Sequence, residues 1–271
     1  MTYHCNFHEI AKKLRLDVLE MSYRAKTSHL ASSLSCVDIL AVLYSSILKL
    51  NPQNHRCPER DRFILSKGHA ATALYAALAW KGIISEEKLK SYAKDSSLLE
   101  EHPSPKLPGV EASSGSLGHG LAIANGMALA SKIQNKKFKV YVLLSDGECN
   151  EGSTWEAAMF TSKHSLANLK GIIDYNKWQA TERSQEVLAL EPLSEKWKSF
   201  GWLVKEIDGH DPEKINEALN EESCDLKKPT MIIAHTIKGK GVSFMEDDNN
   251  WHYRIPNELE YCEAIKEISM I

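Results

Sequence analysis

Residues 139–176 read KVYVLLSDGECNEGSTWEAAMFTSKHSLANLKGIIDYN, and this stretch decides the fold. It contains two short apolar runs, 139–145 and 169–175, which lack a clean alternation of apolar and polar residues. A helical pattern over residues 154–164 lies between them. Buried strands that alternate with helices are typical of a parallel sheet with helices on both faces. The stretch therefore predicts a strand–helix–strand unit inside such a sheet.

The rest of the chain continues this alternation. Further strands are predicted at 202–207 and 230–236. Helices are predicted at 70–80, 121–133, 192–200 and 212–222. A further helix is predicted near the N-terminus, where Ile10, Leu14, Val18 and Met21 recur at helical spacing. Ser35 and Asp38 resemble a capping box, which predicts a helix that runs to about Leu48. The predicted fold class is α/β, a parallel sheet with helices on both faces. We expect a single domain over residues 1–271.

Composition excludes several classes of protein. The 271 residues are 43% hydrophobic and 25% charged, with a net charge of −3. No apolar stretch approaches the ~20 residues of a membrane span, and the polar N-terminus does not resemble a signal peptide, so we expect a cytoplasmic protein that binds no membrane. The basic residues form no stripe suited to nucleic acid. Six cysteines without a C-x-x-C pair are interpreted as reduced thiols.

Polar residues follow the two strands of the opening stretch. SDGECNEG at 145–152 places Asp146 and Gly147 after one strand, and Asn176 ends the next. Ligands bind beyond the carboxyl ends of such strands, where neighbouring strands bring side chains together. Carboxylate and amide oxygens suit Mg²⁺ or Ca²⁺, and the dication would attract a diphosphate that the acidic loop alone repels. The alternative interpretation of SDGECNEG is a tight turn with an N-capping acid.

An Asp-Gly pair followed about thirty residues later by Asn at a strand end resembles thiamine diphosphate enzymes. Other motifs indicate one branch, since they resemble the N-terminal portion of transketolases in order and spacing over nearly the whole chain. The motifs are RFILSKGHA (62–70), GSLGHGLAIANGMALA (115–130), LSDGECNEGSTWEAA (144–158), IDYN (173–176), FGW (200–202), IDGHD (207–211), AHTIKGKGVSFME (234–246) and NWH (250–252). The resemblance implies the pyrophosphate-binding domain of the thiamine diphosphate fold.

The resemblance also implies a binding site. Mg²⁺, for which Ca²⁺ or Mn²⁺ can substitute, would be held by Asp146, Asn176 and the carbonyl of Trp178. The residues expected to bind thiamine diphosphate are His69, Gly115, Ser116, Leu117, Gly147, Glu148, Asn176 and His252, with His69, Gly147 and His252 at the diphosphate and Gly115–Leu117 at the aminopyrimidine.

Three histidines are the expected catalytic residues. His29, His69 and His102 match histidines that line the substrate channel of transketolases, where imidazoles can move protons on sugar hydroxyls near neutral pH. Each imidazole, taken alone, could instead be structural, and that bland interpretation is preferred for His164, His210 and His235. Lys238 and Lys240 could line a phosphate site or lie in a solvated loop.

The sequence departs from the family pattern at four places. Ser145 replaces the Gly that usually precedes Asp-Gly, and Leu30-Ala31 replace the Pro-Gly that commonly follows His29. His119 replaces the usual Gln, and Tyr253 replaces the Gly that usually follows Trp-His. The last three are expected near the site, so the donor ketose and acceptor aldose stay open, as does whether the substrate is phosphorylated.

A transketolase continues into a pyrimidine-binding domain and a third domain, which we expect to be absent from this chain. We therefore expect the N-terminal subunit of a split transketolase that transfers a two-carbon ketol unit from a sugar or sugar phosphate. Its partner would be a C-terminal subunit, the assembly α2β2, and Glu151 would lie at the interface between the chains. Alternatives are the α subunit of a 2-oxo acid dehydrogenase, an enzyme that makes deoxyxylulose phosphate, and a catalytically silent cofactor-binding module.

Overall fold

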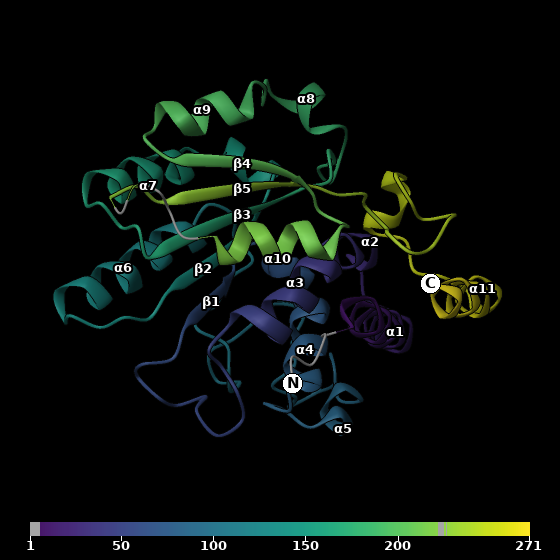
Figure 1. Cartoon of the computed structure of the whole chain (residues 1–271). Helices are drawn as coiled ribbons and strands as arrows, with labels where there is room; N and C mark the ends of the chain where they lie inside the picture. Colours follow the sequence, from purple (N-terminus) through teal and green to yellow (C-terminus); the bar gives the residue numbers. More distant parts are fainter. Residues whose placement is uncertain (1–5, 222–224, 226) are drawn as a thin grey trace.

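A five-stranded parallel sheet forms the centre of the computed structural model, which describes residues 6–221, 225 and 227–271. The strand order is β1-β2-β3-β5-β4, and every neighbouring pair is parallel. The strands are β1 Arg62–Leu65, β2 Val140–Ser145, β3 Leu169–Tyr175, β4 Leu203–Asp208 and β5 Thr230–His235. Their carboxyl ends meet at one edge, on the right in Figure 1. The predicted fold class is confirmed.

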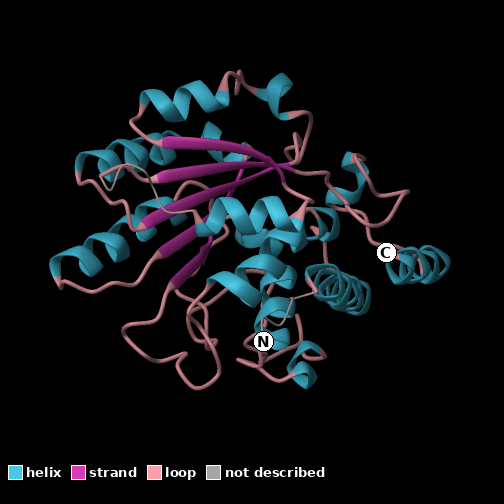
Figure 2. Ribbon diagram, in the orientation of Figure 1, coloured by secondary structure: helices cyan, strands magenta, loops and turns pink. Residues whose placement is uncertain are grey.

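Helices cover both faces of the sheet (Figures 1 and 2). One face packs against α1, α3, α4 and α10 through a core that includes Leu143, Ile172 and Ile232. The other face packs against α6, α7 and α9 through a core that includes Leu144 and Ile173. Consecutive residues of one strand thus enter opposite cores, which explains why the strands lack an apolar and polar alternation.

The helices are short for the most part. Their bounds are α1 Phe7–Ala25, α2 Leu30–Leu34, α3 Val37–Val42, α4 Ala71–Trp80, α5 Glu86–Leu89, α6 Gly120–Ile133, α7 Gly152–Lys163, α8 Ser184–Val187, α9 Leu193–Ser199, α10 Pro212–Asn220 and α11 Glu258–Met270. A π-helical turn, η1, spans Leu43–Ile47, and 3₁₀ turns are η2 Gly68–Ala70, η3 Gly147–Asn150 and η4 Asn249–His252. Glu222, the predicted end of the helix at 212–222, lies outside the described residues.

Two local features differ from the sequence-based expectation. Ser35 and Asp38 form no capping box, because α3 begins after Cys36 without a side-chain cap. The Ser35 hydroxyl instead donates to Asp174 Oδ2 at 2.5 Å, and Asp38 pairs with Arg15 at 2.5 Å. The strand β1 at Arg62–Leu65 was also missed, since four residues are too few to show a pattern. In both places, contacts with residues distant in the sequence determine the local structure.

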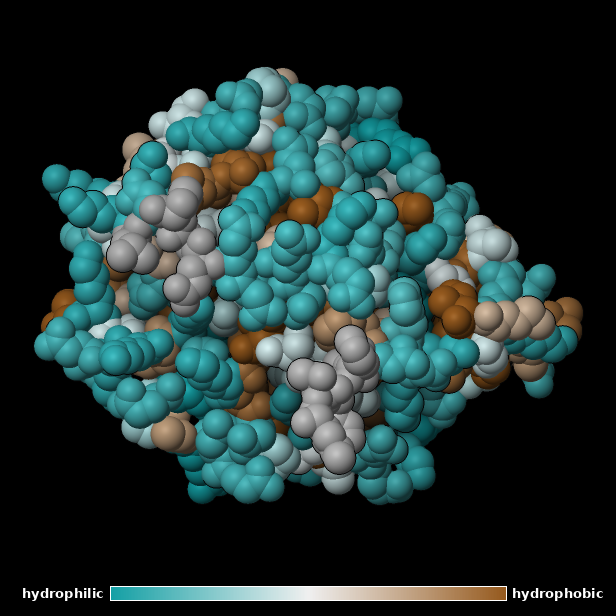
Figure 3. Space-filling model, in the orientation of Figure 1, coloured by the Kyte–Doolittle hydropathy of each residue, from teal (hydrophilic) through white to brown (hydrophobic). Residues whose placement is uncertain are grey.

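The structure describes the surface polarity and four of the six cysteines. The face in Figure 3 is mainly hydrophilic, with small groups of apolar side chains. None of the helices in the described ranges has the length and apolarity to span a membrane. Cys36, Cys57, Cys149 and Cys262 are free thiols, whereas Cys5 and Cys224 lie outside the described residues.

Candidate active site

The carboxyl edge of the sheet brings the predicted metal ligands onto neighbouring strands. Asp146 directly follows β2 and Asn176 directly follows β3, and the two strands pair with Ser145 opposite Asp174. After Asn176 the chain reverses through Lys177, whose φ of 68° is left-handed. The Trp178 N–H then donates to Asn176 Oδ1 at 3.1 Å. The turn holds Asn176 and Trp178 together at the end of the sheet.

Asp146 is a buried carboxylate bonded by neutral donors. Its Oδ1 accepts from the Gly147 N–H at 2.9 Å and its Oδ2 from the Ser184 hydroxyl at 2.8 Å. Burial raises the pKa of Asp146 to about 6, although both hydrogen bonds favour the charged form. A carboxylate oxygen keeps a second lone pair after accepting one bond. Asp146 can therefore still ligate a cation, which would replace the water lost on burial.

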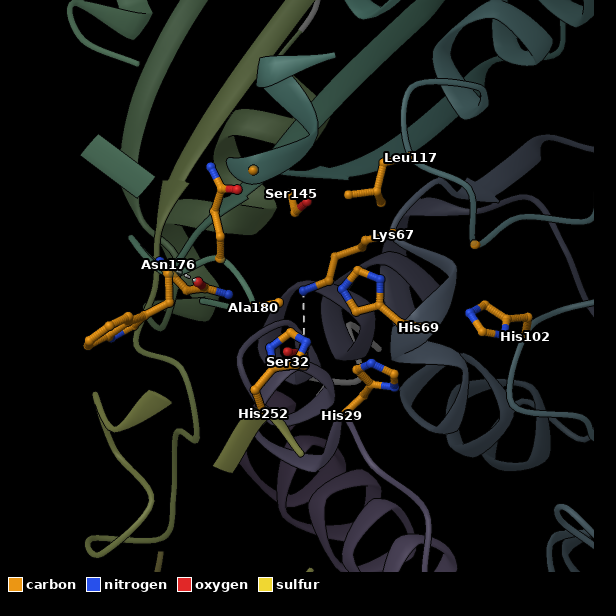
Figure 4. Close-up of a pocket in the computed structure, with 14 residues that line it drawn as sticks. His29, Ser32, Lys67, His69, His102, Leu117, Ser145, Asn176, Ala180 and His252 are labelled. Atoms are coloured by element: carbon orange, nitrogen blue, oxygen red, sulfur yellow. Dashed lines mark hydrogen bonds between the residues drawn. The ribbon is translucent and has the colours of Figure 1, made fainter. Parts of the chain in front are cut away.

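A cavity of about 260 Å³ opens beside these residues (Figure 4). It is lined by most of the predicted site residues, and Figure 4 shows His29, His69, His102 and His252 around it, across from Asn176. The lining residues are His29, Ser32, Lys67, His69, His102, Gly115, Leu117, Ser145, Gly147, Asn176, Trp178, Gln179, Ala180 and His252.

Three imidazoles form a cluster in this cavity. The His29 ring centroid lies 5.3 Å from that of His69 and 5.0 Å from that of His252. Burial, with nearby cations, lowers the pKa of His29 to about 4 and that of His252 to about 3, and lowers the pKa of His69 well below its usual value. All three rings are therefore neutral at pH 7, so each has one N–H donor and one acceptor nitrogen.

His102 reaches the cavity because Gly115 has no side chain. Gly115 has a φ of +141°, and a Cβ there would lie 2.3 Å from His102 Cδ2. A larger residue would have to displace the imidazole. The 115–117 strip thus sets the position of His102 besides lining the cavity itself.

Lys238 contacts the ring of His252 and two side-chain or backbone oxygens. Its Nζ lies 2.9 Å from His252 Nδ1, 2.7 Å from Asn249 Oδ1 and 3.3 Å from the Gln179 carbonyl oxygen. Burial lowers the pKa of Lys238 to about 7, so its ammonium and amine forms are both present near neutral pH. In the ammonium form three donors match these three acceptors, so Nδ1 of His252 accepts and Nε2 carries the proton. Of the two lysines left open, Lys238 is buried at the site and Lys240 pairs with Glu246 at the surface.

Four predicted site residues do not line the cavity. Asp146 lies buried behind it, and Ser116 and Glu151 are exposed. Glu148 is buried, bonded to the Ser66 hydroxyl and accepting from the Gly118 N–H at 2.8 Å. Glu148 therefore ties the strip at 115–118 to the loop at 145–152, and the structure does not bring its carboxylate to the cavity.

Five residues that line the cavity were not among the predicted site residues, namely Ser32, Lys67, Ser145, Gln179 and Ala180. Lys67, in the quoted motif SKGHA, is buried and pairs with Asp174. Gln179 has a side-chain amide nitrogen that is buried without a hydrogen-bond partner among the described residues. Gln179 ends the stretch DYNKWQ, but no pattern distinguished it from an ordinary loop residue.

The contacts of His164, His210 and His235 agree with the structural role preferred for them. His210 Nε2 accepts from the Ile237 N–H at 2.8 Å, and its Nδ1 lies 2.7 Å from Asp38 Oδ2. His235 contacts Glu206 and His164 packs on Phe160, both away from the cavity. His119, one of the departures, is exposed at the start of α6, with its Nδ1 3.1 Å from the Ser116 carbonyl oxygen.

Residues 7–260 match the family model described as "Transketolase, thiamine diphosphate binding domain". The chain is 41% identical to an apulose-4-phosphate transketolase subunit of Phocaeicola vulgatus, over 96% of this chain and 92% of the relative. It is 42% identical to a 6-deoxy-6-sulfo-D-fructose transketolase subunit of Clostridium sp., over 95% and 94%. Among solved structures, transketolase from Campylobacter jejuni superposes with a TM-score of 0.92 at 32% identity, over 99% of this chain and 43% of that one.

Proposed function

This chain belongs to the transketolase family, in its thiamine diphosphate-binding domain, and on that premise we propose that residues 1–271 form one domain, the N-terminal subunit of a two-chain transketolase. With thiamine diphosphate and Mg²⁺ it transfers a two-carbon ketol unit from a ketose to an aldose. The observation that carries the proposal is the cavity in which the Asn176 and Trp178 turn, beside buried Asp146, faces a cluster of neutral imidazoles.

The donor set fits a Mg²⁺–diphosphate. Asp146, Asn176 and the Trp178 carbonyl would supply only oxygen ligands, which Mg²⁺ prefers while it keeps phosphate oxygens as further ligands. Gln179 lines the same cavity, and its buried amide nitrogen lacks a hydrogen-bond partner among the described residues, so a small rotation of the side chain would let it donate to an anion. With Lys238 in its ammonium form, the Nε2–H of His252 would be a second donor. Ca²⁺ or Mn²⁺ would satisfy the same ligands.

The remaining side chains would handle protons on the sugar. Bound thiamine diphosphate supplies the electron sink for carbon–carbon bond chemistry. His29, His69 and His102 would accept and return protons at substrate hydroxyls, because an imidazole has both a donor and an acceptor nitrogen. Lys67, fixed by Asp174 at the cavity floor, contributes a positive charge that favours developing negative charge on the substrate.

A partner chain would complete the site. The chain spans about two fifths of the transketolases of known structure that it matches, whereas two relatives that it covers almost fully are named as single subunits of a transketolase. In α2β2 form, the partner would carry the pyrimidine-binding domain. We place the interface on α6 and α7, where Ile133, Met159 and Phe160 are exposed by 71%, 54% and 40% and where exposed Glu151 is the N-cap residue of α7. Such apolar exposure is typical of an interface.

The substrate class follows from the same relatives. One is named for a sugar phosphate and the other for a sulfonated sugar. We propose that this enzyme also uses a ketose or aldose with a terminal anionic group.

Reconstitution tests the proposal. The isolated chain should show no ketol transfer, and a mixture with a partner chain that carries the pyrimidine-binding and third domains should show it. Phe160→Asp should block association, while the control Leu259→Asp, on exposed α11, should not. Robust turnover by the isolated chain, or none by a cofactor-loaded mixture with ketose and aldose phosphates, would contradict the proposal.

A further inference from the structure

An exposed aromatic ring borders the imidazole cluster at the outer edge of the cavity. The Tyr253 ring centroid lies 4.6 Å from that of His252 and 5.9 Å from that of His29. Both imidazoles line the cavity, whereas Tyr253 does not and is 62% exposed. A large aromatic ring in a protein usually packs against another side chain or a bound molecule. We propose that Tyr253 forms the outer wall of the substrate entrance and selects sugars by the length of their carbon chain.

The backbone around Tyr253 is held in place. The His29 N–H donates to the His252 carbonyl oxygen at 2.8 Å, which joins the 3₁₀ turn η4 to the start of α2. At the other side of the turn, Asp248 accepts from the Asn250 N–H at 2.9 Å and Asn249 accepts from Lys238. The Arg254 N–H, after Tyr253, donates to the Asn250 carbonyl oxygen at 3.1 Å. Because residues before and after Tyr253 are bonded, the backbone position of Tyr253 relative to His29 is fixed.

The neighbouring cation is turned away from the site. Arg254 lies over the Trp251 ring, 4.4 Å from its centroid, and pairs with Glu260 on α11. Tyr253 is therefore the side chain of this pair that borders the histidines. No hydrogen bond to its hydroxyl is found within the described ranges, so the ring offers a free apolar face with a polar tip.

This position gives Tyr253 a role that depends on substrate length. The inference rests on the proposed function: the reacting carbonyl must lie among the imidazoles, so the remote carbons of the sugar extend toward the entrance. A ring at that point contacts the C–H groups of a long sugar and does not reach a short one. Binding energy from such remote contacts raises kcat/KM for the longer substrate.

The test uses the assembled enzyme and acceptor aldoses of two to five carbons, starting from glycolaldehyde. Tyr253→Ala should lower kcat/KM for the longest acceptor used by the wild type about 3–10-fold relative to glycolaldehyde, the range expected for loss of one aromatic contact. Tyr253→Phe should keep most of the preference. The control Leu259→Ala removes an apolar side chain that is 81% exposed on α11. It should leave the kcat/KM of the longest acceptor relative to glycolaldehyde unchanged.

Thiamine diphosphate affinity distinguishes a role of Tyr253 in acceptor selection from a general structural role. The affinity should be equal in wild type and Tyr253→Ala. An equal loss for all acceptors, no loss for any, or a fall in cofactor affinity would overturn the inference while leaving the proposed function standing. Absence of ketol transfer in the wild-type assembly would instead overturn the proposed function.

Discussion

Lys67 and Asp174 form an ion pair beneath the cavity in which both side chains are 0% exposed. Lys67 also donates to the Ser32 carbonyl oxygen at 3.0 Å, and Asp174 accepts from the hydroxyls of Ser35 and Thr236. Burial alone would lower the pKa of Lys67, but the charge of Asp174 beside it raises that pKa. The pair links the end of β1 to β3 and α2, so it fixes the floor of the site.

Removing one member of this pair should destabilise the chain. Lys67→Met should lower the free energy of unfolding of the cofactor-free chain by about 3–5 kcal/mol, because it leaves a buried uncompensated carboxylate. Adding Asp174→Asn should restore part of the loss. Urea unfolding measures both. The control Lys90→Met breaks an exposed pair with Glu87 and should cost less than about 1 kcal/mol. Equal effects of Lys67→Met and Lys90→Met would show that the buried pair has no structural role.

The low pKa of His29 should make stability depend on pH. In the unfolded chain His29 titrates near 6.5, whereas in the folded chain its pKa is about 4. The unfolded state therefore binds the proton first, so the contribution of His29 to stability is complete above pH 6.5 and is lost as the pH falls toward 4. Between pH 7 and 5 the loss should be at most about 1–2 kcal/mol, discounted for partial exposure.

His29→Asn isolates this contribution. Asn tolerates the left-handed backbone of His29, φ 69°, and does not titrate. Urea unfolding at pH 7 and pH 5 should show a smaller loss of stability in His29→Asn than in wild type. The control His8→Asn, on the exposed side of α1, should leave the loss unchanged. An identical pH dependence in wild type and His29→Asn would contradict a buried neutral imidazole.

His102 should affect turnover more than cofactor binding. Its imidazole lines the cavity against Gly115, on the side away from Asn176 in Figure 4. His102→Ala should lower kcat of the assembled enzyme about 10²–10⁴-fold, the usual cost of losing an acid–base group. Thiamine diphosphate affinity, measured by fluorescence titration, should hardly change. A collapse of affinity with normal turnover at saturation would make His102 a cofactor-binding or structural residue.

Strands and long helices could be predicted from the sequence because their patterns are local. The strand β3 at Leu169–Tyr175 matches its predicted bounds, and α4 and α6 start within a residue of theirs. The placement of Asp146 and Asn176 on neighbouring strands followed from the same alternation, since β2 and β3 are adjacent.

Features that depend on distant partners could not be predicted. Ser35 has the spacing of a helix cap, yet its hydroxyl is drawn to Asp174, 139 residues away. Glu148 stands between metal-side residues in the sequence, yet it turns inward to Ser66 and Gly118. Nothing local distinguishes Lys67 or Lys238 from a solvated lysine, because their burial arises from loops that converge only when the sheet has formed.

The central claim is that Asp146 and its neighbours hold thiamine diphosphate through a divalent cation. The most direct measurement is calorimetric titration of thiamine diphosphate into the reconstituted enzyme, with Mg²⁺ and with a chelator. Wild type and the control Glu186→Gln, an exposed carboxylate on α8, should bind tightly only with Mg²⁺. The Asp146→Ala variant, once circular dichroism has shown that it is folded, should show no Mg²⁺-dependent binding of thiamine diphosphate. Unchanged Mg²⁺-dependent affinity in Asp146→Ala would contradict the account.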